Sequence, residues 1–296
     1  MEDCKICQHV ESITPSNSSH LNYINQIKQR MLECPKWNDL YSHPFTFVNE
    51  ISKIKDVTFG FYEILELYSV LHLSIPLNNN ILYTIHFGKE APMTIKALQY
   101  LRKSTHNHIY FVCHHADKET TTVPVDIAFC DASSENEYEN ALSIIKQITI
   151  VLNVQKNEGV CIIKYGDMLS PISLDIISFL SHFYEKVYIT KPSICDAGSS
   201  AKYIVCKHFI RDKMNEETMK KIAMLHSACI QPLSRIYRIL DVPIPLFFSG
   251  KMDEINSVFT QPRLEYIHGL LSQYDNGNSV STNKHKTKEW CEHYLF

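Results

Sequence analysis

Three charged residues come directly after apolar segments of strand length. Asp131 follows the run Val-Asp-Ile-Ala-Phe-Cys, Lys164 follows Val-Cys-Ile-Ile, and Lys191 follows Val-Tyr-Ile-Thr. In an open α/β sheet, ligands bind beyond the carboxyl ends of the strands, so these side chains are candidates for a reacting site. A lysine whose pKa is lowered by burial or by a second cation can take a proton from a hydroxyl group. The ordinary alternative is that charged residues at strand ends are simply solvated.

A second group, near the start of the chain, has residue types that bind zinc. Cys4, Cys7 and His9 have partly zinc-like spacing, and His20 or Cys34 would have to complete the four ligands. Because the spacing does not fix the fourth ligand, the simpler alternative is a terminal segment with incidental thiols. The zinc content of the purified protein distinguishes the two.

The elements that must position the strand-end residues alternate between strand and helix. Such alternation predicts an α/β fold, with a mostly parallel sheet covered by helices on both faces. The last two strands are joined by a short loop, so one of them can be antiparallel, at the edge or between neighbours. The predicted strands are residues 81–87, 109–113, 123–130, 160–163, 186–189 and 203–206, and the predicted helices among them are 91–101, 136–154 and 174–184.

Composition excludes several classes of protein. The 296 residues are 45% hydrophobic and 21% charged, with a net charge of −3, which is typical of a globular chain and excludes a uniformly basic nucleic-acid coat. We find no apolar run of the ~18 residues that a membrane helix needs, and the polar first twenty residues do not resemble a secretory signal. We therefore expect a cytoplasmic protein with reduced cysteines, without a membrane partner.

Four segments carry a family resemblance. They are Gly159-Val-Cys-Ile-Ile-Lys-Tyr-Gly-Asp, Leu169-Ser-Pro-Ile-Ser, Phe183-Tyr-Glu-Lys-Val-Tyr-Ile-Thr-Lys-Pro and Ser199-Ser-Ala-Lys-Tyr-Ile-Val-Cys-Lys. In this order they resemble the FtsJ-like RNA ribose 2′-O-methyltransferases, in the style of the cap-specific enzymes of eukaryotes and large DNA viruses. The resemblance implies a Rossmann-like, S-adenosylmethionine-dependent methyltransferase fold with helical extensions at both ends. The implied parts are an N-terminal extension over 1–44, an FtsJ-like domain over 45–210 and a C-terminal helical extension over 211–296.

The family uses a Lys–Asp–Lys–Glu tetrad, whose central lysine deprotonates the ribose 2′-hydroxyl while S-adenosylmethionine supplies the methyl group. By position, the resemblance implies that Asp131 and Lys164 are the retained aspartate and central lysine. Gly60 falls at the position of the first lysine and Ala201 at that of the glutamate. Asp196 stands where the family has an arginine, which reverses the charge where RNA phosphates would approach.

The turn that would hold the cofactor also departs from the family pattern. Thr84 replaces an acidic residue, and Gly88 is the only glycine of a turn that is normally glycine-rich. Lys89, Glu90 and Pro92 would place side chains where a ligand needs space. Only nine residues separate the strands ending at 113 and starting at 123, too few for another helix and strand.

Three interpretations follow. The first is an FtsJ-like homologue that has lost methyl transfer and acts as a binding or regulatory subunit in RNA capping or processing. Its partners would be RNA, capped mRNA included, and a protein such as an active methyltransferase or a capping enzyme. The second is an active, S-adenosylmethionine-dependent cap 2′-O-methyltransferase with a divergent cofactor pocket. The third is an unrelated α/β protein. A viral origin fits the Asn, Ile, Lys and Tyr content, and would place the protein in a virus factory or a virion.

Overall fold

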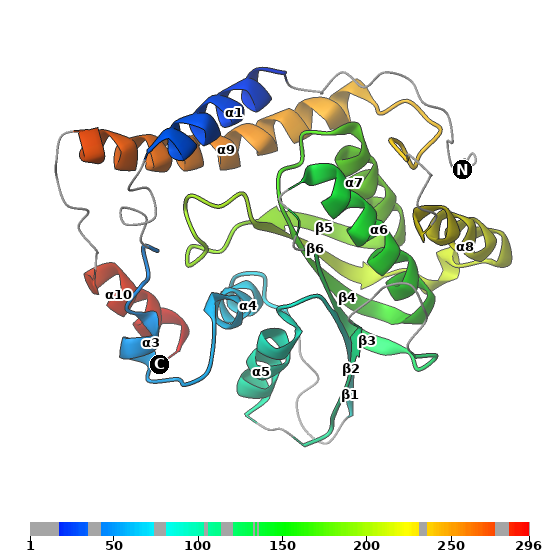
Figure 1. Ribbon diagram of the computed structural model, residues 1–296. Helices are drawn as coiled ribbons and strands as arrows, with labels where there is room; N and C mark the ends of the chain where they lie inside the picture. Colours follow the sequence, from blue (N-terminus) through cyan, green and yellow to red (C-terminus); the bar gives the residue numbers. More distant parts are fainter. Residues whose placement is uncertain are drawn as a thin grey trace.

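The computed structural model of the chain gives a mixed α/β architecture, with one sheet between layers of helices (Figure 1). The predicted zinc ligands Cys4, Cys7 and His9 lie outside the residues that it describes. Those residues are 18–34, 43–73, 81–103, 106–113, 121–132, 134, 136–230, 236–275 and 284–295.

The sheet has six strands in the order β2-β1-β3-β4-β6-β5. The pairs β2–β1, β1–β3 and β3–β4 are parallel, whereas β6 runs antiparallel to both of its neighbours. The antiparallel strand therefore lies between β4 and β5, one of the two places that the sequence left open. The strands are β1 (Leu82–Phe87), β2 (His108–Cys113), β3 (Val125–Asp131), β4 (Gln155–Tyr165), β5 (Tyr184–Thr190) and β6 (Lys202–Phe209).

Helices cover both faces of this sheet. The long helix α9 extends past the sheet with α1 packed along it, and α10 lies beside α3 (Figure 1). None of the helices in the described ranges is long and apolar enough to span a membrane. The helices are α1 (Ser18–Glu33), α3 (Val48–Ser52), α4 (Phe59–Val70), α5 (Ala91–Arg102), α6 (Glu137–Val154), α7 (Pro171–Phe183), α8 (Glu216–Ile230), α9 (Leu246–Asp275) and α10 (Lys284–Tyr294), with a short 3₁₀ turn η1 (Arg211–Lys213).

Alternation along the strands divides the core into two layers. In β3, Ala128 and Cys130 pack with residues of α6, α7 and α8, whereas Ile127 and Phe129 pack with residues of α4, α5 and α10. Successive strand residues point to opposite faces, so a strand buried on both sides reads as a continuous apolar run. This double burial explains why the central strands were recognisable in the sequence.

A buried chain of hydrogen bonds ties β1 to β2 and to the start of α5. The Thr94 hydroxyl donates to the Ala91 carbonyl (3.0 Å), so its Oγ1 accepts from His86 Nδ1 (2.7 Å). His86 Nε2 is then an acceptor for the Thr84 hydroxyl (2.7 Å), which in turn accepts from His108 Nε2 (2.8 Å). Each hydroxyl has one proton to donate, and the chain is therefore complete with both imidazoles neutral.

The neutral state of these histidines makes the fold sensitive to acid. Burial, and secondarily the proximity of His108, lowers the pKa of His86 to about 3, and burial and Arg102 lower that of His108 to about 4. Both values lie below the ~6.5 of an unfolded histidine. As the pH falls below ~6.5, the unfolded chain binds protons that the folded chain does not yet bind. The free energy of unfolding, which has its full value above this pH, therefore decreases.

We predict that the free energy of unfolding, measured by urea denaturation, drops between pH 7.5 and pH 5, with about 2 kcal/mol of the drop due to His86. His86→Gln removes the titrating group and should shrink the drop. The matched control is His268→Gln at an exposed position of α9, which should leave the drop unchanged. Equal stability of the unaltered chain at the two pH values would contradict the prediction.

Candidate functional site

The predicted residues Asp131 and Lys164 lie side by side at one edge of the sheet. Asp131 is the last residue of β3, Lys164 is the penultimate residue of β4, and the two are paired in register. Strands β3 and β4 are parallel, so their carboxyl ends meet at the same edge. The fold thus brings the two retained family positions together, next to the elements that cover this edge.

A third charged residue, Glu63 of α4, completes the group. The Lys164 Nζ donates to Glu63 Oε2 at 2.7 Å, and the Tyr203 hydroxyl of β6 donates to the same oxygen at 2.5 Å. The side chain of Glu63 is 7% exposed and that of Lys164 is 23% exposed. The carboxylate therefore lies between the helix and the sheet, with a cation and a phenol as its partners.

This ion pair fixes the charge state of both groups. Burial alone would raise the pKa of Glu63, but the Lys164 ammonium and the hydrogen bonds from Lys164 and Tyr203 lower it below its ordinary value. Burial alone would lower the pKa of Lys164, but the Glu63 carboxylate raises it above its ordinary value. Lys164 is accordingly an ammonium at neutral pH, with no lone pair to accept a proton.

The turn after β1 packs directly against Asp131. Gly88 has φ +83°, and a Cβ at this position would lie 2.7 Å from the Asp131 carbonyl oxygen and 2.8 Å from its carboxylate. Burial raises the pKa of the Asp131 carboxyl group, and the Lys164 ammonium partly opposes this effect. The turn after β1 thus lies in close contact with this carboxyl group.

The two positions at which the sequence departs from the tetrad are Gly60 of α4 and Ala201, just before β6. A Cβ on Gly60 would lie 2.3 Å from Glu90 Oε2, and the Thr58 hydroxyl also donates to that carboxylate at 3.1 Å. Ala201 precedes β6, where its N–H donates to the Ser199 hydroxyl at 3.0 Å. Glu90 thus fills the space beside Gly60.

Sequence reasoning did not select Glu63, and it missed Glu66 as well. Glu66 is 4% exposed, and its carboxylate accepts from the backbone of Ser193 and Ile194 and from the Trp290 indole at 2.8 Å. It thereby holds the β5–β6 segment and α10 against α4. The sequence feature that could have identified both residues is the pair of carboxylates, three residues apart, in the otherwise mostly apolar helix 59–70.

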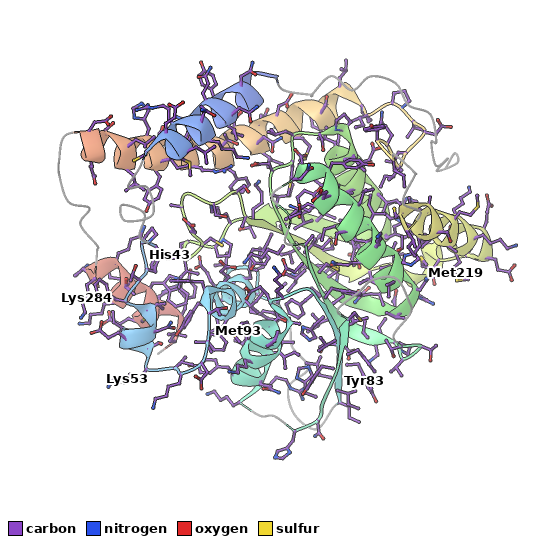
Figure 2. The ribbon with its side chains drawn as sticks, viewed as in Figure 1. His43, Lys53, Tyr83, Met93, Met219 and Lys284 are labelled. Atoms are coloured by element: carbon purple, nitrogen blue, oxygen red, sulfur yellow. The ribbon has the colours of Figure 1, made fainter. Side chains whose placement is uncertain are left out.

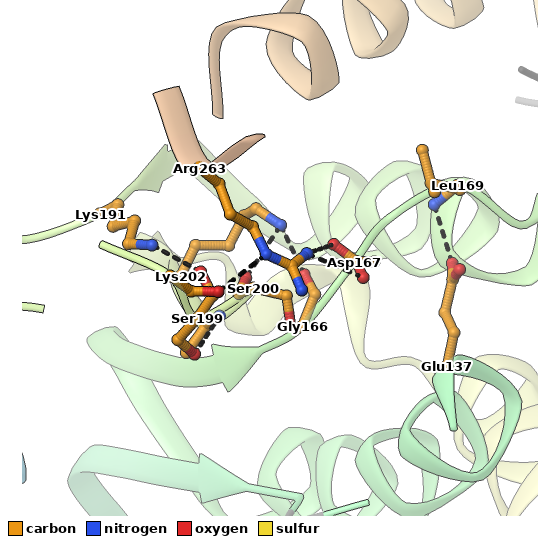
Figure 3. A network of polar contacts seen from close by, with 11 residues as sticks. Glu137, Gly166, Asp167, Leu169, Lys191, Ser199, Ser200, Lys202 and Arg263 are labelled. Atoms are coloured by element: carbon orange, nitrogen blue, oxygen red, sulfur yellow. Dashed lines mark hydrogen bonds and ion pairs between the residues drawn. The ribbon is translucent and has the colours of Figure 1, made fainter. Parts of the chain in front are cut away.

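A polar pocket of about 480 Å³ adjoins the ends of β4 and β6, between these strands, α1 and α9. Arg263 lines this pocket, whereas Lys191 and Lys202, drawn near it in Figure 3, line an adjoining cavity of about 10 Å³. Arg263 donates to the Asp167 carboxylate at 3.2 Å and to the carbonyl of Gly198 at 3.0 Å. The lining residues are Lys28, Met31, Leu32, Ser134, Glu137, Asn140, Gly166, Asp167, Ser199, Ser200 and Arg263.

Both lysines of this group donate only to backbone carbonyls. Lys191 Nζ contacts the Ser199 oxygen at 2.6 Å, and Lys202 Nζ contacts the Gly166 oxygen at 2.6 Å and the Ser200 oxygen at 3.2 Å. Burial lowers the pKa of both amines, that of Lys202 to about 8. The Asp167 carboxylate is among the groups that oppose this lowering of the pKa for both lysines.

Asp196 lies in the same β5–β6 loop as Gly198. Its Oδ1 accepts from the Gly198 N–H at 2.8 Å, and burial raises its pKa. Arg263 of α9 donates to the Gly198 carbonyl of this loop, and Lys202 of β6 donates to its Ser200 carbonyl. No group of three or more His, Cys, Asp or Glu side chains within the described ranges could hold a metal ion.

The comparisons with known proteins agree with this architecture. Residues 82–209 match the model of the FtsJ-like methyltransferase family. The chain is 27% identical over 147 residues (49% of the chain, 32% of the relative) to the probable methyltransferase EP424R of African swine fever virus. It is 26% identical over 102 residues (31% and 40%) to the ribosomal RNA large subunit methyltransferase E of Methanocaldococcus jannaschii.

One similar solved structure is a phosphoethanolamine N-methyltransferase 2 from Haemonchus contortus in complex with S-adenosylhomocysteine. It aligns with a TM-score of 0.36 and 13% identity, and the alignment covers 56% of this chain and 42% of that one. Residues 82–209 are an FtsJ-like methyltransferase domain on a Rossmann-like fold. This excludes the interpretation as an unrelated α/β protein. The match spans about a third of the length of the viral relatives.

The Glu63–Lys164 pair yields a prediction about stability. Lys164→Met leaves a buried carboxylate without its cation and should lower the free energy of unfolding by about 3 kcal/mol. Adding Glu63→Gln should recover part of this loss, because the remaining amide is neutral. Urea denaturation of the single and double variants measures both effects.

The control for this cycle is Lys251→Met, which breaks an exposed pair with Glu254 and should cost less than about 1 kcal/mol. Additive losses in the double variant, or a Lys164→Met loss no larger than that of the control, would show that the pair is not coupled.

Proposed function

We propose that this chain is an FtsJ-like homologue that no longer transfers methyl groups, and that it serves as a binding or regulatory subunit in RNA capping or processing. The observation that carries the proposal is the ion pair between Lys164 and Glu63. A general base must present an unprotonated atom to the hydroxyl that it activates. Lys164 of β4 is held as an ammonium by the buried carboxylate of Glu63, which helix α4 supplies.

The turn after β1 supports the same proposal. S-adenosylmethionine binding at such a turn relies on close backbone approach and on free amide donors. Here the Asp131 carboxyl group packs against Gly88, and the Glu90 carboxylate fills the space beside Gly60. The residues present do not fit the cofactor, and the proposal involves no step through it.

RNA is the partner that the proposal favours. The name of the archaeal relative refers to ribosomal RNA, and Lys28 and Arg263 line the pocket beside the strand ends. A protein partner, such as an active methyltransferase or a capping enzyme, would supply the chemistry that this chain lacks. A cytoplasmic location, including a virus factory or a virion, belongs to the same proposal.

The alternative function is an active S-adenosylmethionine-dependent cap 2′-O-methyltransferase. The observation in its favour is that Asp131 and Lys164 are both present and paired in register at the strand ends. In that case the turn would have to open, with Asp131 moving away from Gly88 and Glu90 moving away from Gly60.

Calorimetry with S-adenosylmethionine and S-adenosylhomocysteine separates the two functions. We expect no heat of binding from either ligand, and no methyl transfer to capped or uncapped RNA, while an active FtsJ-like enzyme responds in the same assays. Binding in the micromolar range, with transfer that disappears in Lys164→Ala, would establish the alternative and refute the proposal.

A further inference from the structure

The two edge strands of the sheet, β2 and β5, differ in how their edges are protected. Strand β5 carries Glu185 and Lys186, both exposed, as its second and third residues. Charged side chains of this kind keep an edge strand from pairing with another chain. Strand β2 has no Asp, Glu, Lys, Arg or Pro, and its register with β1 runs unbroken over all of its residues. It therefore lacks the devices that protect the opposite edge of the same sheet.

The side chains of β2 are typical of an interior strand, although much of their surface faces solvent. The strand reads His-Ile-Tyr-Phe-Val-Cys, and Ile109 is 42% exposed, Tyr110 48% and Val112 36%. Because successive strand residues point to opposite faces, the exposure of both Ile109 and Tyr110 leaves both faces of the sheet open at this strand. Exposed apolar residues that are contiguous, rather than scattered singly, indicate an interaction surface.

The order of the strands indicates what this edge fits. The order β2-β1-β3-β4 follows the doubly wound arrangement, in which a further strand pairs with the second strand on the side away from the first. Residues 114–124, which join β2 to β3, are too few for a helical crossover together with another strand. In the described parts of the chain, β1 is the only strand paired with β2. The outer edge of β2 is therefore suited to an extended segment from another chain.

We propose that β2 pairs antiparallel with β2 of a second copy of this chain, so that two six-stranded sheets join about a two-fold axis. In such a pair, directly opposite residues lie on the same face of the sheet, so the axis passes through a residue of the strand. A register centred on Tyr110 places Ile109 opposite Phe111 of the second copy. A register centred on Phe111 places Tyr110 opposite Val112 of the second copy.

Both registers are self-complementary. Each places aromatic side chains opposite aromatic or aliphatic ones, and such cross-strand pairs stabilise antiparallel strands. A two-fold axis also brings the central residues beside their own copies, so a charge there would face a like charge. The uncharged sequence of β2 avoids this repulsion. This self-complementarity is the reason for assigning the edge to a second copy rather than to a different protein.

The surface uses no residue of the candidate site. Strand β1 separates β2 from β3 and β4, whose ends hold Asp131 and Lys164. The proposal therefore goes beyond the proposed function and is independent of it. Binding of S-adenosylmethionine would refute the proposed function and leave the dimer standing, whereas absence of the dimer would leave the proposed function untouched.

The test is sedimentation equilibrium of the full chain at increasing concentrations. We expect a reversible equilibrium between monomer and dimer, whose dissociation constant rises at least about tenfold in Tyr110→Lys, because the substitution alters the contact in both copies. Ile109→Lys, on the other face of the strand, should act in the same direction and is the second variant if Tyr110→Lys does not fold. The matched control is Tyr188→Lys on the edge strand β5, where the tyrosine is 37% exposed; it should leave the dissociation constant unchanged.

Hydrogen exchange identifies the paired strand. The backbone amides of β2 that point away from β1 should exchange more slowly as the concentration of the chain rises, whereas exchange in β5 should not change. A chain that stays monomeric at every concentration, or a dimer that neither β2 variant weakens, would overturn the proposal. Exchange in β2 that does not depend on concentration would overturn it as well, because the edge would then be covered within the chain or left unpaired.

Discussion

The ion pair between Glu63 and Lys164 joins helix α4 to the centre of the sheet, and the rest of the candidate site depends on it. A buried pair of this kind contributes little net stability by itself, but breaking it leaves a charge in the protein interior. It therefore fixes which residues of α4 face the strands. Glu66, three residues further along the same face, then meets the β5–β6 segment and the Trp290 indole, and so α10 is attached to the same helix.

The same edge of the sheet is closed by a second set of contacts. The Asp131 carboxyl group packs against Gly88 in the turn after β1, and the Glu90 carboxylate fills the space next to Gly60. Asp131 is also paired in register with Lys164, so these contacts adjoin the Glu63–Lys164 pair. Beside them, the pocket under α1 and α9 (Figure 2 shows α9 running over the strand ends) is lined by Lys28 and Arg263 together with Glu137 and Asp167.

The fold could be read from the sequence because its signals are local. Strands buried on both faces give continuous apolar runs, and the strands β1 to β6 lie within a few residues of the predicted ranges, except that β4 begins earlier, at Gln155. The sequence did not predict that β6 lies between β4 and β5. The loop that joins the last two strands is compatible with an antiparallel strand either at the edge of the sheet or between neighbours.

The site was less predictable because its contacts are remote in sequence. Glu63 lies 101 positions before Lys164, and Arg263 lies 96 positions after Asp167, so no spacing pattern connects them. Motif alignment along α4 pointed to Gly60, and Glu63 is three residues further on, on the same face of the helix. A shift of one turn in a helix is invisible to the alignment but changes which side chain meets the lysine.

The central claim is that Glu63 keeps Lys164 protonated. The most direct test is to measure the pKa of the Lys164 ammonium by NMR titration of selectively labelled lysine. The account predicts a pKa above that of ordinary lysine in the unaltered chain, and a fall in Glu63→Gln, in which burial is no longer offset by the carboxylate. A Lys164 pKa already below the ordinary value in the unaltered chain, unchanged by Glu63→Gln, would contradict the account and return Lys164 to the role of a base.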